Sequence, residues 1–348
     1  MAFVDRLSGH CFSRRHLLLS FPLMLAAAAL LATAAPTTAA NPAAKDVISF
    51  RIGHNEPLGS PMNDAFEQWV KVLKEKSNGR LNPANFPAGQ TGNYLQNIEA
   101  NRLGTIEVTS GGLDTEAKIA PIVAILGLGY VVNSYDHVDK VHQGPLGKLL
   151  SDEAKKKTGV YFIAYGEAGF RHVVAKKPVR SMADLKGLKM RVPETPMAIR
   201  LFQLMGTNPT PVPYSELYTA LQTGVVDAAE NPISDILGHK FYEPAPHVAL
   251  TGHQFNAKAI RVNARWFDSL PADLQQIIRD TAVEVFAKER ADSRQREAGS
   301  IQKMKDLGVK FYEVEKKPLI ESVTKQHEEY VKEYPEAVDF MKQVKAVQ

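Results

Sequence analysis

An alternation of short strands and helices around one arginine constrains the fold of this sequence more than any other feature. Residues 187–192 predict a strand with apolar side chains at alternate positions, ended by a proline. Helices at 196–205 and 215–223 and a strand at 225–229 follow. This pattern is typical of α/β folds, in which helices cover a sheet. It also places Arg191 at a strand end, where a planar guanidinium can hold a carboxylate through two hydrogen bonds.

A polar turn after the first predicted strand marks a second candidate part of the site. Residues 47–53 alternate and are rich in β-branched side chains, which predicts a strand, and a helix is predicted from Ser60 onward. The turn between them contains His54, Asn55 and Glu56. Ligands of α/β sheets bind outside the carboxyl ends of the strands, so these three side chains are candidates for binding.

The N-terminal region has the layout of a secretory signal peptide. Arg14 and Arg15 precede the apolar run 17–31, and small residues follow it. An uncleaved membrane anchor is the alternative, but the run is short for a bilayer span. We therefore expect residues 1–40 to be removed after export to the periplasm, by either the general or the twin-arginine route. Cys11, the only cysteine, lies in that segment, so the mature protein has no thiol for disulfides or catalysis.

Charge and motif content argue against several classes of function. The formal net charge is only +4 and no basic cluster is interleaved with aromatic residues, so we expect no nucleic-acid partner. The chain has no G-x-S-x-G motif and no compact set of nucleophile, histidine and acid, which argues against a secreted hydrolase and leaves that class only as an alternative. His54, Glu56 and His253 lack the spacing of metal motifs. We therefore expect polar contacts from them, and neither a metal nor a cofactor.

Several motifs resemble the substrate-binding subunit of tripartite ATP-independent periplasmic (TRAP) transporters, the family named for its dicarboxylate-binding member. The resemblance extends over essentially the whole mature chain, and the motifs are specific in combination although each is short. They are Gly169-x-Arg171, Asp184–Pro193 (DLKGLKMRVP), Pro213–Gln222 (PYSELYTALQ) and Glu230-Asn231-Pro232, together with Arg51-Ile52-Gly53 and Phe86–Gln90 (FPAGQ).

The resemblance implies a two-lobed periplasmic binding protein of the Venus-flytrap type, in which two α/β lobes joined by a hinge close over a small organic acid. A long helix is expected to span both lobes. The stretch 271–307 is mostly helical by its apolar pattern and is the candidate for that helix, with a bend at Gly299. The expected division is residues 1–40 as signal peptide, 45–168 and 258–297 as lobe I, and 169–257 and 298–348 as lobe II.

The resemblance also implies roles for three residues. Arg191 would pair bidentately with the ligand carboxylate, Arg171 would make a second contact, and Asn231 would add a hydrogen bond. The residues themselves leave alternatives open: Arg191 could pair with Glu230 instead, Arg171 could tie the hinge, and Asn231 could be a turn residue. The full candidate set for ligand binding is Arg191, Arg171, Asn231, Glu230, Asn55, His54, Glu56, Tyr214 and His253.

The expected ligand is a carboxylate joined to a polar body. A sugar acid such as a uronate or an aldonate is favoured, because Glu56 and the histidines can exchange hydrogen bonds with hydroxyls. A C4-dicarboxylate and a 2-oxo acid remain alternatives. The segment Ala228-Ala229 departs from the glycine and polar residue common in the family, which leaves the polarity of the far pocket wall open.

The resemblance also implies partners. These are the small and large membrane subunits of a TRAP transporter, which would receive the ligand from a protein that is not itself embedded in the membrane after cleavage. We expect a monomer. An extracytoplasmic sensor is the alternative partner.

Overall fold

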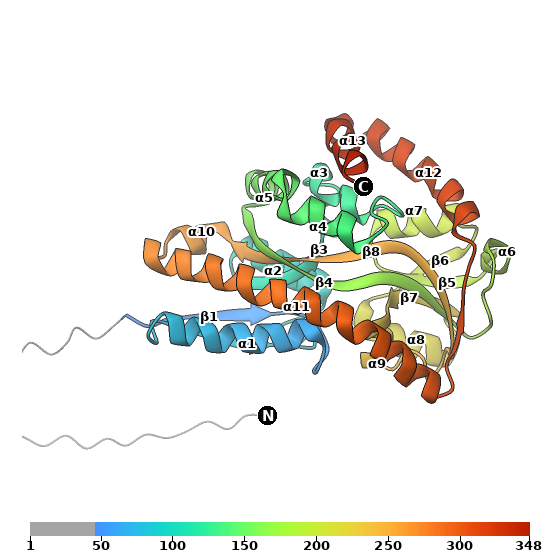
Figure 1. The fold of residues 1–348 in the computed structure, drawn as a ribbon, viewed down its shortest axis with the longest axis horizontal. Coiled ribbons are helices and arrows are strands. Elements are labelled where there is room, and N and C mark those ends of the chain that lie inside the picture. The colour runs from blue at the N-terminus through green and yellow to red at the C-terminus, as the bar shows by residue number, and fades with distance from the viewer. Residues whose placement is uncertain (1–45) are drawn as a thin grey trace, which may run out of the picture. The chain divides into compact units, whose positions relative to one another are not determined.

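The computed structural model describes residues 46–348, and one mixed sheet runs through this part of the molecule (Figure 1). The predicted signal peptide and Cys11 lie outside the described residues. The sheet has nine strands here, in the order β2-β1-β3-β8-β4-β7-β5-β6, with β9 paired to β8. Parallel pairs at its two ends are joined by an antiparallel centre. The prediction of an α/β fold is confirmed.

The first part of the sheet is built around β1 (Ile48–Gly53), which pairs in parallel with its two neighbours. The predicted helix after the polar turn forms as expected, because the Ser60 side chain caps it by accepting a hydrogen bond from the Asn63 amide. The neighbouring elements are α1 (Pro61–Lys76), β2 (Leu81–Phe86), α2 (Tyr94–Leu103) and β3 (Val108–Gly112).

The second part of the sheet contains the strand of Arg191 and confirms the predicted alternation of strands and helices. Its last strand lies a few residues later than expected. Gly224 ends a helix in the left-handed conformation and the Val226 amide donates back to Ala220, so residues 225–227 form a turn. The elements are β5 (Lys189–Val192), α7 (Pro196–Leu204), β6 (Asn208–Pro211), α8 (Leu217–Thr223), β7 (Ala228–Pro232) and α9 (Ile233–Gly238).

Two long antiparallel strands join these parts, β4 (Val160–Ala175) and β8 (His247–Asn263). Glycines occur inside both strands, at Gly166 and Gly169 in β4 and at Gly252 in β8. The structure keeps the strands continuous through shifts of register, one of them between Glu167 and Phe170. Gly169 has a φ of +91° at this shift, a conformation that glycine adopts without steric cost. The bulges therefore bend β4 without ending it.

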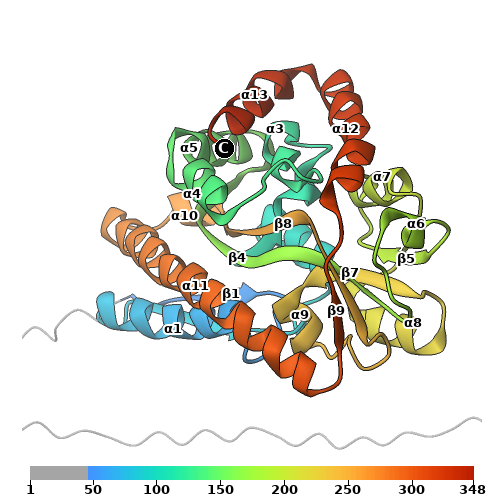
Figure 2. The same cartoon turned by 45° about the vertical axis from the view of Figure 1, so that its right-hand side comes forward.

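The predicted long helix is α11 (Ala272–Asp306), a single helix of 35 residues. It contacts α1 and β4 as well as α9, so it reaches both parts of the sheet, as Figure 2 shows. The bend expected at Gly299 is not a helix break, since the helix continues through it. In residues 46–348 no helix combines the length and apolar composition needed to cross a bilayer.

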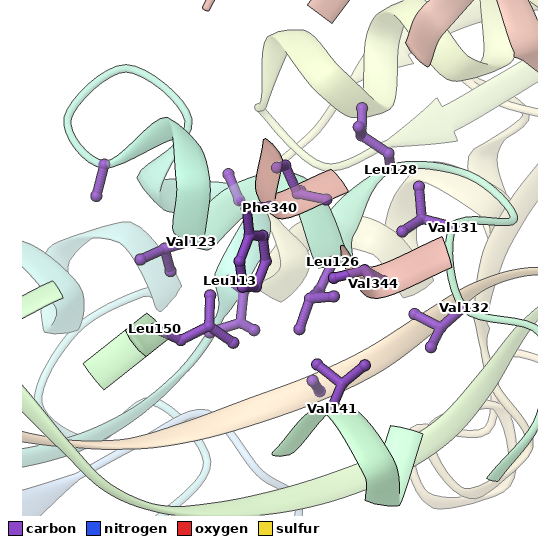
Figure 3. Packing of buried hydrophobic residues seen from close by; sticks show 14 of the residues in the cluster. Leu113, Val123, Leu126, Leu128, Val131, Val132, Val141, Leu150, Phe340 and Val344 are labelled. Atoms are coloured by element: carbon purple, nitrogen blue, oxygen red, sulfur yellow. The ribbon is translucent and has the colours of Figure 1, made fainter. Parts of the chain in front are cut away.

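The C-terminal helices return to the middle of the chain. Phe340 and Val344 pack into a buried cluster with Leu113, Val123 and Leu150 (Figure 3).

The residue boundaries given above for the two lobes stay a prediction. The other helices of the described chain and the last strand are α3 (Pro121–Ala124), α4 (Tyr135–Gln143), α5 (Pro145–Thr158), α6 (Met182–Leu185), α10 (Ala264–Asp268), α12 (Lys316–Glu333), α13 (Val338–Ala346) and β9 (Lys310–Tyr312), with 3-10 helices at Leu113–Glu116, Ile125–Gly127, Tyr214–Glu216 and Pro335–Ala337.

Candidate functional site

A cavity lies where strand ends from both parts of the sheet meet the middle of β4 and β8. The turn after β1 contributes Asn55 and Glu56, the end of β5 contributes Arg191, and β7 contributes Asn231. The middle strands β4 and β8 add charged and amide side chains, which lie between the residues from the first part of the sheet and those from the second. The further lining residues used below are Arg171, Tyr94, Asp114, Glu194, Thr195, Tyr214, Asp235 and Lys258.

Arg191 is buried in the wall of this cavity, and no acid among residues 46–348 forms an ion pair with it. Only 2% of its surface is exposed. Its Nε donates to the carbonyl of Val212 at 2.9 Å, whereas one terminal nitrogen has no partner within the described residues. The guanidinium carbon lies 5.7 Å from the centre of the Tyr214 ring. Burial lowers the pKa of Arg191 to about 10 against the attraction of Glu230, so the group still carries its charge at neutral pH.

Arg171, on strand β4 at the other side of β7, is neutralised by the protein. Its Nε and one terminal nitrogen bind the two carboxylate oxygens of Glu230, the second at 2.7 Å, and that nitrogen also donates to the Glu230 carbonyl at 2.9 Å. Burial works against both charges. The attraction between the two side chains outweighs the effect of burial. It raises the pKa of Arg171 and lowers the pKa of Glu230 to about 2. The ion pair considered for Arg191 and Glu230 is therefore formed by Arg171 instead.

His253 completes this arrangement from behind the cavity wall. Its Nε2 lies 3.2 Å from a carboxylate oxygen of Glu230, and its Nδ1 lies 2.8 Å from the hydroxyl of Thr251. The ring is fully buried, and burial lowers the pKa of His253. A neutral ring then donates from Nε2 to Glu230 and accepts from Thr251 at Nδ1. His253 and Glu230 do not line the cavity; they fix the orientation of Arg171.

Asn231 and Tyr214 place unpartnered polar atoms beside Arg191. The amide nitrogen of Asn231 has no partner within residues 46–348, although only 1% of the residue is exposed. The Tyr214 hydroxyl is likewise buried without a partner. Buried polar groups are nearly always hydrogen-bonded in native proteins. Together with the free guanidinium nitrogen of Arg191, these atoms form a set of donors that a carboxylate would satisfy.

The turn after β1 forms the opposite wall. Glu56 accepts from the ammonium of Lys258 at 3.1 Å and from the Ser110 hydroxyl at 3.2 Å. His54 lies behind this turn, where its Nδ1 accepts from the Glu56 amide at 3.2 Å and its ring stacks on Phe66. Glu56 thus reaches the cavity, whereas the fully buried His54 positions the turn.

Sequence reasoning missed four charged residues of the lining, the exposed Glu194 and three others. Lys258 interrupts an otherwise apolar part of β8, Asp235 lies in α9 directly after β7, and Asp114 follows β3. Burial raises the pKa of Asp235 and of Asp114. A lysine between two alanines of a buried strand is a signal that the sequence does contain. The two aspartates have no local signal, because only the fold brings them to the cavity.

Comparisons with known proteins agree with this geometry. Residues 52–334 match the family model described as bacterial extracellular solute-binding protein, family 7. The chain is 31% identical over 303 residues to the 2,3-diketo-L-gulonate-binding periplasmic protein of Escherichia coli K12, covering 86% of this chain and 92% of that protein. It is 28% identical to the C4-dicarboxylate-binding periplasmic protein of Rhodobacter capsulatus, covering 81% and 85% of the two chains.

Solved structures give the same assignment. A TRAP periplasmic solute-binding protein of Roseobacter denitrificans with bound β-D-glucuronate superposes with a TM-score of 0.84 at 25% identity, covering 86% of this chain and 100% of that one. A sugar-acid-binding protein of Advenella mimigardefordensis with galactonate gives 0.83 at 28% identity, with 87% and 99% covered. The predicted two-lobed fold, the solute-binding function and the periplasmic location are thereby confirmed. The chain belongs to family 7 of the bacterial extracellular solute-binding proteins, the periplasmic binding proteins of TRAP transporters.

Proposed function

We propose that this protein captures a sugar acid in the periplasm, with Arg191 holding the carboxylate, and delivers it to the small and large membrane subunits of a TRAP transporter. The observation that carries the proposal is the buried guanidinium of Arg191, which has an unpartnered nitrogen at the cavity wall. Relatives and structural neighbours bind diketogulonate, glucuronate and galactonate, which are all sugar acids.

The carboxylate would complete the donor set beside Arg191. One oxygen accepts from the free guanidinium nitrogen, and the amide of Asn231 and the hydroxyl of Tyr214 supply further hydrogen bonds. Arg171 makes the second cationic contact through its terminal nitrogen that is not bound to Glu230. A buried cation with no partner is costly, and a ligand carboxylate removes that cost on binding.

The remaining candidates divide into contact and support residues. Asn55 and Glu56 face the ligand from the first part of the sheet, where Glu56 can accept from hydroxyls. His54, Glu230 and His253 hold the contact residues in place. Because the ligand touches residues from both parts of the sheet, its binding favours the closed arrangement of the two lobes.

A binding screen tests the proposal. Thermal unfolding of the purified mature protein is measured with glucuronate, galacturonate, galactonate, succinate and pyruvate, and with neutral glucose as the control. A ligand at one hundred times its Kd stabilises the folded state by about 2.7 kcal/mol. We expect such a shift from at least one sugar acid and none from glucose. Stabilisation by succinate or pyruvate alone would contradict the ligand class, and no shift from any acid would contradict the carboxylate clamp.

Transport tests the proposed partners. Liposomes that contain the small and large membrane subunits should take up the identified sugar acid only when this protein is added. Uptake that does not depend on the protein would contradict delivery to these subunits.

A further inference from the structure

Most of the cationic side chains that line the cavity already form ion pairs with acidic side chains of the protein. Arg171 is bound by Glu230, and Lys258 by Glu56, in both cases through largely buried side chains, none of which is more than 11% exposed. Of the cations lining the cavity in the described chain, Arg191 alone has no carboxylate within ion-pair distance. Glu194, the acid nearest to it in sequence, is exposed to solvent at the edge. The site therefore offers one unpaired positive charge.

Two acidic side chains of the lining have no cation of their own. Asp235 is only 5% exposed, and its carboxylate takes part in no ion pair or side-chain hydrogen bond within residues 46–348. Asp114 forms one long contact, with the Thr195 hydroxyl at 3.5 Å. An unpaired carboxylate with so little exposure is costly unless a ligand donates hydrogen bonds to it.

These acids line the same cavity as Arg191 but come from other elements, Asp235 from α9 and Asp114 from the 3-10 helix after β3. The charges that act most strongly on Asp235 are Lys258 and Glu56, which come from β8 and the turn after β1. The charges that act most strongly on Arg191 are Glu230 and Arg171, on β7 and β4. Because Asp235 lines the same cavity, a ligand whose carboxylate is held by Arg191 can contact Asp235 with its other groups.

We propose that Asp235, supported by Asp114, makes the site selective for monocarboxylates whose far end donates hydrogen bonds, and that it excludes dicarboxylates. This inference rests on the proposed function of Arg191. An ionised carboxylate only accepts hydrogen bonds, so hydroxyls of the ligand tail donate to Asp235 and satisfy it. A second ligand carboxylate would instead meet a like charge, with Lys258 and Arg171 already bound by Glu56 and Glu230.

Matched ligand pairs test this selectivity. Galactonate and galactarate share their carbon chain and differ at one end, which is a primary alcohol in the first and a carboxylate in the second. Gluconate and glucarate form a second pair with the same difference. Calorimetric titration of the mature protein should show a preference for the monocarboxylate on the order of 100-fold, because like charges at close range cost several kcal/mol.

Substitutions then assign the selectivity to a residue. In Asp235→Asn we expect the preference to fall by about 10-fold or more, since the amide keeps the shape, removes the negative charge and can donate to a carboxylate. Asp114→Asn should have a smaller effect in the same direction. The control is Asp339→Asn on α13, an exposed acid outside the cavity, which should leave the ratio unchanged.

The outcomes separate this inference from the proposed function. Absence of binding by every acid of the screen would overturn both. Equal affinity for the two members of each pair, or an unchanged ratio in both cavity variants, would overturn the inference and leave the carboxylate clamp standing. If the cavity variants fail to unfold cooperatively, the ratio measured on the unsubstituted protein decides the question.

Discussion

Arg171 and Arg191 line the same cavity from the two strands that flank β7, yet the protein treats them oppositely. Arg171 is paired with Glu230, an acid of the strand between them, whereas Arg191 binds only a backbone carbonyl and leaves a nitrogen unpartnered. The charge of the same residue type is thus compensated by the protein at one position and left for a ligand at the other. The difference lies in the placement of one carboxylate, and it can be tested by removing each arginine.

The largest expected effect is on stability, from Arg171→Met. This substitution leaves the Glu230 carboxylate buried without its partner, which typically costs about 3–5 kcal/mol. Urea unfolding of the mature protein measures the loss. The double variant with Glu230→Gln should recover most of it, because no charge is then left unpaired. The matched control is Arg191→Met, which removes an unpartnered cation and should leave stability equal or higher. Equal losses from the two single substitutions would contradict the distinction between the arginines.

A somewhat smaller effect is expected on binding, from Arg191→Lys. Lysine keeps the charge but loses the planar fork, and truncating one partner of a buried pair costs about 2–5 kcal/mol, or roughly 30-fold to several thousand-fold in Kd. Calorimetric titration with the sugar acid from the screen measures this change, while the melting temperature without ligand should hardly move. The control is Arg200→Lys, at an exposed ion pair with Glu329. Near-normal affinity of Arg191→Lys would show that the clamp lies elsewhere.

The smallest effect is a change in acid sensitivity. The pKa of Glu230 is lowered from 4.5 to about 2, so between these values the unfolded chain binds a proton that the folded protein does not. The stability from the Arg171–Glu230 pair is therefore complete above about pH 4.5 and is lost as the pH falls toward 2. The stability difference between the unsubstituted protein and Glu230→Gln should narrow over this window in chemical unfolding experiments. A constant difference from pH 6 to pH 2.5 would argue against an ionised pair.

The sequence predicted the part of the fold that depends on local pattern. The strand that ends at Arg191, the helices after it and α11 follow from apolar spacing and from proline and glycine positions. The long strands β4 and β8 were not predicted from local pattern. Their continuity depends on register shifts near Gly169, which pairing with neighbouring strands stabilises and which a single strand pattern does not reveal.

The site was predictable only where its residues follow strand ends. Arg191, Asn231 and Glu56 were found in this way and do line the cavity. The pairing of Glu230 with Arg171 could not be predicted, because it depends on the register between β4 and β7. Asp235 was missed because it lies in a short helix after a strand, and no local sequence pattern distinguishes such a residue as part of a binding site.

The packing of α13 has a consequence for the folding of the protein during its synthesis. Phe340 and Val344 pack into a core whose other members come largely from residues 113–165, with Met197 and residues of β8 among the rest, so that core stays incomplete until α13 has been translated. A ribosome-bound chain cannot finish it early, and an apolar groove remains uncovered in the nascent polypeptide. Deletion of residues 339–348 would thus leave the binding cavity unchanged in sequence but expose an apolar surface, and we expect such a chain to aggregate.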